Sequence, residues 1–279
     1  MNDREIKALI SLLDDDDYEV ATHVEHKLRT LGGVAVPFLE NEWENTAMSS
    51  PLLQKKIEDL IHDLQFKSVI ERLMAWKEGG AMDLLEGFWI VSTYQYRDLT
   101  FDKLKIDFEQ LFYEIWLEFR PNMTPIDQIK ILNSVFFGKL KFGANTRNFH
   151  SASNSMINIV LETHKGNPIS LCSIYMMVAN KLGIPLYGVN LPNLFVLTFK
   201  SKEFQFYINV FNKGLVFTRN DIDNYIAQLN IPPTDIFYQP CTHLDIIKRV
   251  LRNLVLSFEK TGDDDKVKEI ELILKTISE

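Results

Sequence analysis

Few side chains in this 279-residue chain could carry out nucleophilic or acid–base chemistry, since it holds two cysteines and six histidines. Cys172 lies in an apolar segment, and a cysteine thiolate needs a nearby base, usually a histidine, to attack a carbonyl carbon. The possible partners of Cys172 are His150 and His164, which precede its segment, and His243, which follows it at a distance. The chemistry to consider is therefore acyl transfer or hydrolysis through a thiol.

Histidines and aspartates also raise the question of a metal site, but each ligand set is incomplete. His23 and His26 are three apart on one predicted helix, a spacing that can hold a metal, yet no third ligand accompanies them. Cys241 and His243 are two apart and equally isolated. The run Asp14–Asp17 lacks the spacing of a calcium loop, and we interpret it as a solvated turn between helices. We therefore expect no metal and no cofactor.

Composition narrows the classes of partner and compartment. The formal charge of −8 and the scattered Lys and Arg residues argue against nucleic-acid binding through phosphates. No apolar run approaches the roughly 20 residues that span a bilayer, and the N-terminal residues lack a signal-peptide pattern, so we expect no membrane association. Two cysteines are too few for a disulfide framework and fit a reducing compartment. These features predict a soluble cytoplasmic protein.

The N-terminal segment, residues 1–64, has the three- and four-residue apolar spacing of short amphipathic helices. Gly32-Gly33 predicts the end of one helix, and Ser49-Ser50-Pro51 predicts the start of another that reaches Leu64. The pattern LLDDDDYEVATHVEHKLRTLGGVAVPFLE resembles a HEAT-type helical repeat. Such helix pairs need a neighbour to stack on, because alone they cannot bury both faces.

The central segment, residues 65–240, is predicted to change from helices to strands. Residues 65–153 are mostly helical, and their aromatic residues at helical spacing predict one buried face: Phe108, Phe112, Trp116 and Phe119. Residues 154–220 contain a central helix and then short apolar runs separated by turn residues, which predict an antiparallel meander. Residues 241–279 are predicted to form a helical hairpin. This order predicts an α+β fold, and no Gly-rich phosphate loop accompanies it.

The stretch from Asn154 to Gly214 carries the most specific pattern. Its successive elements are Asn154-Ser155, Asn158–Leu161, Gly166–Leu171, Leu182–Pro185, Pro192–Phe195 and Ile208–Phe211. In these elements the chain resembles the transglutaminase-like superfamily, and more specifically its SirB-type bacterial branch. The resemblance is close over roughly 60 residues, and in this branch the helical tail resembles a tetratricopeptide hairpin. It implies a papain-like core in which a central helix packs on a small antiparallel sheet.

In the active enzymes that this chain resembles, a cysteine begins the central helix, where the helix dipole stabilises its thiolate. A histidine on the next strand moves the proton, and an aspartate on the following strand orients that histidine. The resemblance places these roles on Pro168, Leu194 and Asn209. None of these three side chains can perform its role. Asn167 and Pro168 instead suit the N-cap and first position of a helix.

Two functions remain open from the sequence. The first is a non-catalytic module that binds a protein or peptide, because the resemblance implies a cleft now lined by amides that both donate and accept hydrogen bonds. Its candidate lining residues are Asn167, Pro168, Cys172, Asn193, Leu194, Asn209 and Asn212. The alternative is a divergent cysteine hydrolase or acyltransferase whose nucleophile is Cys172, one helical turn beyond Pro168. We favour the first, because most free cysteines are small buried apolar groups.

Overall fold

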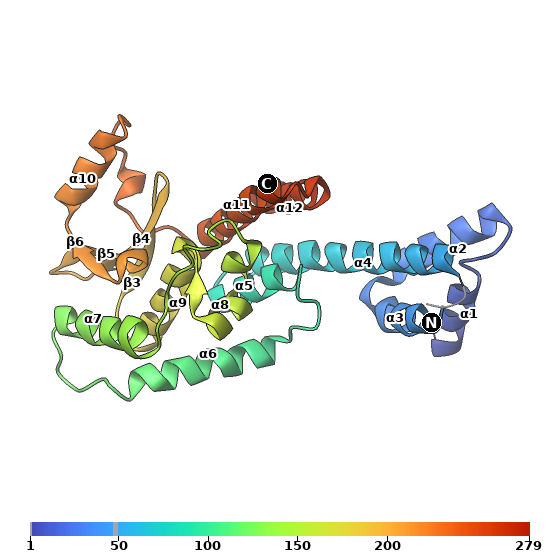
Figure 1. Cartoon of the computed structure of the whole chain (residues 1–279), viewed down its shortest axis with the longest axis horizontal. Helices are drawn as coiled ribbons and strands as arrows, with labels where there is room; N and C mark the ends of the chain where they lie inside the picture. The colour runs from blue at the N-terminus through green and yellow to red at the C-terminus, as the bar shows by residue number, and fades with distance from the viewer. Residues whose placement is uncertain (1, 47–49) are drawn as a thin grey trace. The chain divides into compact units, whose positions relative to one another are not determined.

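A computed structural model describes residues 2–46 and 50–279 of the chain. The contacts divide the chain into two compact units, Met1–Leu73 and Met74–Glu279, and the boundary falls within the helix α4 (Pro51–Glu78). The helices and strands of each unit are labelled in Figure 1. Of the residues predicted to start α4, Ser49 lies outside the described part of the chain.

The first unit is helical, with α1 (Asp3–Ser11), α2 (Tyr18–Leu31), the 3₁₀ turn η1 (Gly32–Ala35), α3 (Val36–Thr46) and the first part of α4. The aspartate run is a turn between α1 and α2, as predicted, because Asp17 accepts a hydrogen bond from Glu19 N and caps α2. Gly32 ends α2 with a φ of +62°, which confirms the predicted helix stop. The core of the unit is apolar, with members such as Ile6, Leu28 and Leu60.

The prediction that α4 ends at Leu64 is wrong, because the helix continues to Glu78. Residues 65–78 contain no proline or glycine, and the next helix-breaking residues are Gly79 and Gly80. Val69 and Leu73 continue the buried stripe beyond Leu64 at helical spacing. The predicted boundary between residues 1–64 and residues 65–153 therefore lies inside a continuous helix.

The second unit contains the helices and helical turns that follow α4. In chain order they are α5 (Leu84–Ser92), α6 (Phe101–Trp116), α7 (Pro125–Asn133), the π-helical turn η2 (Ser134–Lys139), the 3₁₀ turn η3 (Ala152–Ser155), α8 (Ile157–Thr163), α9 (Pro168–Lys181), the 3₁₀ turn η4 (Val210–Asn212), α10 (Arg219–Gln228), the 3₁₀ turn η5 (Asp235–Phe237), α11 (His243–Thr261) and α12 (Asp264–Ser278). Antiparallel α11 and α12 form the predicted hairpin, and Gly262 ends α11 in the left-handed conformation.

The predicted meander is confirmed as a four-stranded antiparallel sheet in the order β3-β4-β5-β6. Its strands are β3 (Leu186–Leu191), β4 (Leu194–Lys200), β5 (Gln205–Asn209) and β6 (Leu215–Phe217). The register runs from Leu186 opposite Phe199 to Leu191 opposite Leu194, across a two-residue turn. A separate parallel pair joins β1 (Gly143–Ala144) to β2 (Lys165–Gly166). The structure therefore confirms the predicted α+β class.

The central helix α9 is a largely buried element of the second unit. Ten of its 14 residues are buried, so neighbours surround it on most sides. It contacts β3, β4 and η4 on one side and α8 and α11 on others, and Figure 1 shows it between the sheet and α8. Residues at its N-terminus are therefore held from several directions at once.

The predicted aromatic face of α6 is only partly buried. Phe108 and Phe112 lie in the core, as the spacing predicted, but Trp116 is 52% exposed at the end of the helix. Tyr113 is also exposed. Trp116 follows the pattern of a buried stripe, yet it is the last residue of α6, which ends with its C-cap at Leu117.

A long-range contact between α7 and the turn before β6 connects helices to sheet. Asn133 Nδ2 donates to Gly214 O at 3.0 Å, and Asn133 Oδ1 accepts from the buried Tyr175 hydroxyl at 2.8 Å. Gly214 has a φ of +73°, and a Cβ there would lie 1.9 Å from Asn133 Oδ1. Only glycine satisfies both the backbone conformation and this close approach.

We predict that Gly214→Ala lowers the free energy of unfolding by about 3 kcal/mol, because left-handed backbone strain adds to an overlap with Asn133. Gly262→Ala is a matched control, since Gly262 has the same φ of +73° but nothing within 4 Å of the added Cβ. Its loss should be about 1 kcal/mol. Urea denaturation of the two variants measures the difference. Equal losses would show that the Asn133 contact contributes nothing.

Candidate functional site

The start of α9 is fixed by a reciprocal cap, as the sequence predicted. Asn167 Oδ1 accepts from Ser170 N at 3.0 Å, and Asn167 N donates to Ser170 Oγ at 3.1 Å. Pro168 occupies the first helical position, where its missing N–H leaves no donor unsatisfied. The position that the resemblance assigns to a nucleophile therefore holds a ring that offers neither a nucleophile nor a donor.

The other end of the Asn167 amide extends the cap into a buried network. Its Nδ2 donates to Ser155 Oγ at 2.8 Å, which joins α9 to the segment before α8. The neighbouring Asn154 donates to Asn148 O at 2.7 Å and to Phe149 O at 3.0 Å. Asn167, Ser155 and Asn154 are all buried. These hydrogen bonds therefore take the place of the hydrogen bonds to water that their polar groups lose on folding.

The lack of a side chain at Gly166 leaves room for Ser170 and Val160 to pack against the backbone beside this network. A Cβ on Gly166 would lie 2.5 Å from Ser170 Oγ and 3.0 Å from a methyl group of Val160. The motif elements Asn154-Ser155 and Gly166–Leu171 are thus parts of one hydrogen-bonded unit. Their spacing in the sequence reflects packing around the N-terminus of α9.

The strand positions that the resemblance assigns to a base and its partner are occupied by Leu194 and Asn209. Leu194 begins β4 after a turn in which Pro192 precedes Asn193, and Asn193 has a φ of +57°. A type II turn favours proline followed by such a residue. Asn209 Oδ1 accepts from Asn212 N at 3.0 Å and so caps η4.

The seven predicted cleft residues therefore differ in what they can offer a ligand. Both ends of the Asn167 amide and the Oδ1 of Asn209 are occupied by bonds within the protein. Asn193 and Asn212 are exposed, and Pro168 and Leu194 are partly exposed. The seventh residue, Cys172, is completely buried.

Cys172 lies inside the core. Its Sγ donates to Phe195 O at 3.5 Å, so the thiol sits beside the residue that follows Leu194. Burial raises the pKa of the Cys172 thiol far above its ordinary value, and the Val210 backbone amide and the charge of Arg249 offset this only in part. A buried thiol with a raised pKa is protonated at neutral pH and is a poor nucleophile.

The histidines considered as bases make other contacts. His164 Nδ1 bonds to Leu140 O, and its ring stacks on Phe142 at 4.2 Å between centroids. His243 Nδ1 bonds to Ala81 O at 2.9 Å. His150 is exposed and meets the Phe149 ring edge-on at 5.2 Å. No bond found within residues 2–46 and 50–279 joins any of the three to Cys172.

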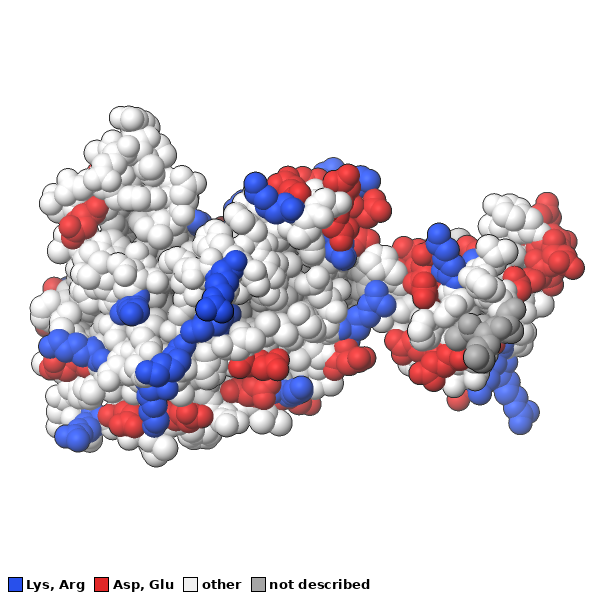
Figure 2. Space-filling model, in the orientation of Figure 1, with Lys and Arg blue, Asp and Glu red and all other residues white. Residues whose placement is uncertain are grey.

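Among the described residues, no group of three or more His, Cys, Asp or Glu residues is placed to hold a metal ion. None of the helices in the same residues is both long and apolar enough to cross a membrane. On the face shown in Figure 2, a short row of Lys and Arg side chains is bordered by Asp and Glu. Cys241 is partly buried, and burial raises the pKa of its thiol to about 12.

Arg249 of α11 is a structurally important residue that the sequence did not single out. Its Nη1 donates to Asn190 Oδ1 at 2.8 Å and to Leu191 O at 3.1 Å, which fixes the end of β3. Burial lowers the pKa of Arg249, while the two nearby thiols oppose that shift. No local pattern signals this contact, because the partners are almost 60 positions apart.

The comparisons with known proteins agree with the fold. The family model of the transglutaminase-like superfamily matches residues 102–252, which are more than half of the chain. The chain therefore belongs to the transglutaminase-like superfamily. The matched range includes α6, the whole of α9 and the four-stranded sheet.

Individual relatives match about half of the chain. A UPF0162 protein of Xylella fastidiosa strain 9a5c is 30% identical over 141 residues, which cover 48% of this chain and 50% of the relative. The UPF0162 protein YchA of Escherichia coli is 25% identical over 151 residues, covering 54% and 55%. F-box only protein 21 of Mus musculus is 30% identical over 141 residues, covering 48% and 22%. The chain thus spans about half the length of these bacterial relatives. No solved structure gives a significant match.

We predict that Asn167→Ala lowers the free energy of unfolding by about 2–4 kcal/mol, because it removes the cap of α9 and leaves Ser155 without its buried donor. Asn209→Ala is the comparison variant, since it removes one cap from a short, partly exposed turn, and it should cost about 1 kcal/mol. Denaturant titration followed by circular dichroism measures both. A smaller loss for Asn167→Ala than for Asn209→Ala would contradict the central role of this network.

Proposed function

We propose that this chain is a non-catalytic transglutaminase-like protein that binds a protein or peptide partner. The observation that carries the proposal is Pro168 at the first position of α9, where a catalytic member needs its cysteine. The base and orienting positions hold Leu194 and Asn209, so the charge and proton-transfer groups of the mechanism are missing together.

Asn193, Leu194 and Asn212 form the proposed contact surface, together with Pro168. All four retain exposed area, and the two exposed amides offer donors and acceptors suited to a peptide backbone. Contacts of α9 with both β4 and η4 support their placement around one cleft. In this proposal Asn167 and Asn209 support the surface from within, because their Oδ1 atoms already bind backbone amides.

The alternative is a divergent cysteine hydrolase or acyltransferase that uses Cys172. One observation favours it: the thiol lies beside Phe195 and the Val210 amide, which directly follow the base and aspartate positions. Its burial and raised pKa oppose it, and a base within about 3 Å would be required. The reactivity of this thiol distinguishes the two functions.

The proposal includes a finer placement of the protein. We assign it to the SirB-type branch, which the matches to bacterial UPF0162 proteins support, and to the cytoplasm, which its two free cysteines support. We propose that residues 1–64 form a HEAT-like module, that residues 65–240 form the transglutaminase-like core, and that residues 241–279 form a tetratricopeptide-like hairpin. Both helical parts would then serve as additional contact surfaces for a partner.

We predict that Cys172 is alkylated only when the protein unfolds. In a Cys241→Ser background Cys172 is the single cysteine, and its labelling at pH 8 should be at least about 100-fold slower in the folded protein than in urea, because the thiol is enclosed and protonated. Mass spectrometry of timed samples gives the rates. Rapid labelling of the folded chain with a midpoint below about pH 8.5 would establish an activated thiolate and favour the enzyme.

We predict that a random peptide library selected on the intact chain yields peptides that bind the proposed surface. Leu194→Arg and Asn212→Arg should each weaken their binding about tenfold or more, because a long charged side chain would obstruct the cleft. Glu203→Arg is the control, since Glu203 lies exposed in the β4–β5 turn. Fluorescence polarisation measures all three. Peptides that bind every variant equally would contradict this location for the site.

A further inference from the structure

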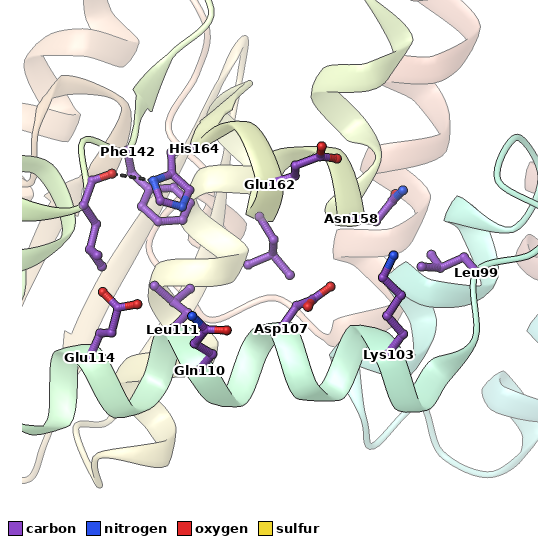
Figure 3. Close-up of a pocket in the computed structure, with 12 residues that line it drawn as sticks. Leu99, Lys103, Asp107, Gln110, Leu111, Glu114, Phe142, Asn158, Glu162 and His164 are labelled. Atoms are coloured by element: carbon purple, nitrogen blue, oxygen red, sulfur yellow. Dashed lines mark hydrogen bonds between the residues drawn. The ribbon is translucent and has the colours of Figure 1, made fainter.

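An open groove of about 360 Å³ lies between α6 and the segment that contains α8, and none of the residues of the contact surface proposed above lines it. Figure 3 shows the side chains of α6 pointing up toward Glu162 and Asn158 of α8. Asp107 and Glu114 line the groove from α6, and Glu162 lines it from α8. Carboxylates from two helices thus face one space.

The remaining polar lining combines donors and acceptors, from Gln110, Asn158 and His164. A carbonyl oxygen only accepts, so Nδ1 of His164 carries a proton in its bond to Leu140 O. The stack on Phe142 holds the ring and fixes the direction of Nε2. Asn158 contributes a side-chain oxygen that is buried and accepts no hydrogen bond from the described residues. A buried acceptor of this kind requires a donor.

The lining has an uneven balance of charge. Lys103 is the one lysine or arginine among its described residues, and in Figure 3 its ammonium group lies at the end near Asn158. Three carboxylates therefore face a single cation. The walls between them are apolar, with Leu111 and Leu161 positioned to contact the stem of a long side chain. A donor-rich cationic group complements this arrangement.

The surface of α6 beside the groove is apolar and exposed. Ile106, Tyr113 and Leu117 follow one another at seven- and four-residue steps and are 66%, 56% and 72% exposed. This spacing places them on one stripe of the helix, next to the positions that line the groove. A free amino acid in the groove would leave the stripe uncovered, whereas a protein partner would cover it.

We propose that the groove between α6 and α8 binds the guanidinium group of an arginine side chain carried by a protein partner. A guanidinium offers five N–H donors in a planar fork, which suits carboxylates that approach from two helices. A lysine ammonium has three donors on a compact centre and cannot form the same paired contacts. The apolar stripe of α6 takes the residues that flank the arginine.

The first experiment titrates the intact chain with N-acetyl-arginine amide and follows backbone amide shifts by NMR. We expect shifts at α6 and α8 and saturable binding, with binding about tenfold weaker for the lysine and citrulline analogues. Glu162→Gln should weaken arginine binding about fivefold or more. Glu203→Gln, an exposed acid in the β4–β5 turn, should not change it. Equal binding of arginine and its neutral isostere citrulline would overturn the proposal.

The second experiment distinguishes the source of the guanidinium. A peptide with leucines on both sides of a central arginine should bind about tenfold more tightly than the free amide, and Tyr113→Ala should remove that gain without changing the binding of the amide. No gain would show that the groove serves a small molecule and would overturn the protein partner. The proposal does not depend on the α9 cleft, so Leu194→Arg should leave arginine binding unchanged even if the cleft binds no peptide.

Discussion

The side chain of Asn167 is the constraint on which the rest of this fold depends. Its Oδ1 caps the largely buried central helix α9, and its Nδ2 joins that helix to Ser155 in the segment before α8. Both bonds are buried, so neither can be replaced by water without loss of stability. Gly166 and Ser170 permit the close approach. The superfamily pattern in this region therefore describes a helix start that persists whether or not a nucleophile occupies it.

The bonds that hold the fold together do not involve a catalytic group, and this bears on the two sites that we infer. The helix N-terminus to which the resemblance assigns a cysteine holds Pro168, and Cys172 is enclosed in the core. The strand positions nearby are filled by a leucine and by an amide that caps a turn. Exposed polar groups remain at the proposed contact surface, while three carboxylates line a groove on α6 and α8. We propose that both surfaces serve recognition.

The sequence predicted those features that depend on neighbouring residues. The cap by Asn167, the first-position Pro168 and the meander all follow from local rules, and the structure confirms them. The sequence could not predict that Nδ2 of Asn167 bonds to Ser155, or that Asn133 bonds to Tyr175, because those partners meet only after folding. Trp116 shows the same limit, since helical spacing predicts a stripe but not what covers it. The groove was likewise hidden, because its carboxylates belong to two separate helices.

The central claim is that the fold is retained without acyl-transfer chemistry, and the most direct test is intact-mass analysis of the folded chain after incubation with a glutamine-containing peptide and an amine. The account predicts an unchanged protein mass, with no acyl adduct and no amine joined to the peptide. Cys172→Ser should behave identically. A covalent adduct that forms on the folded chain and disappears in Cys172→Ser would contradict the account and establish an enzyme.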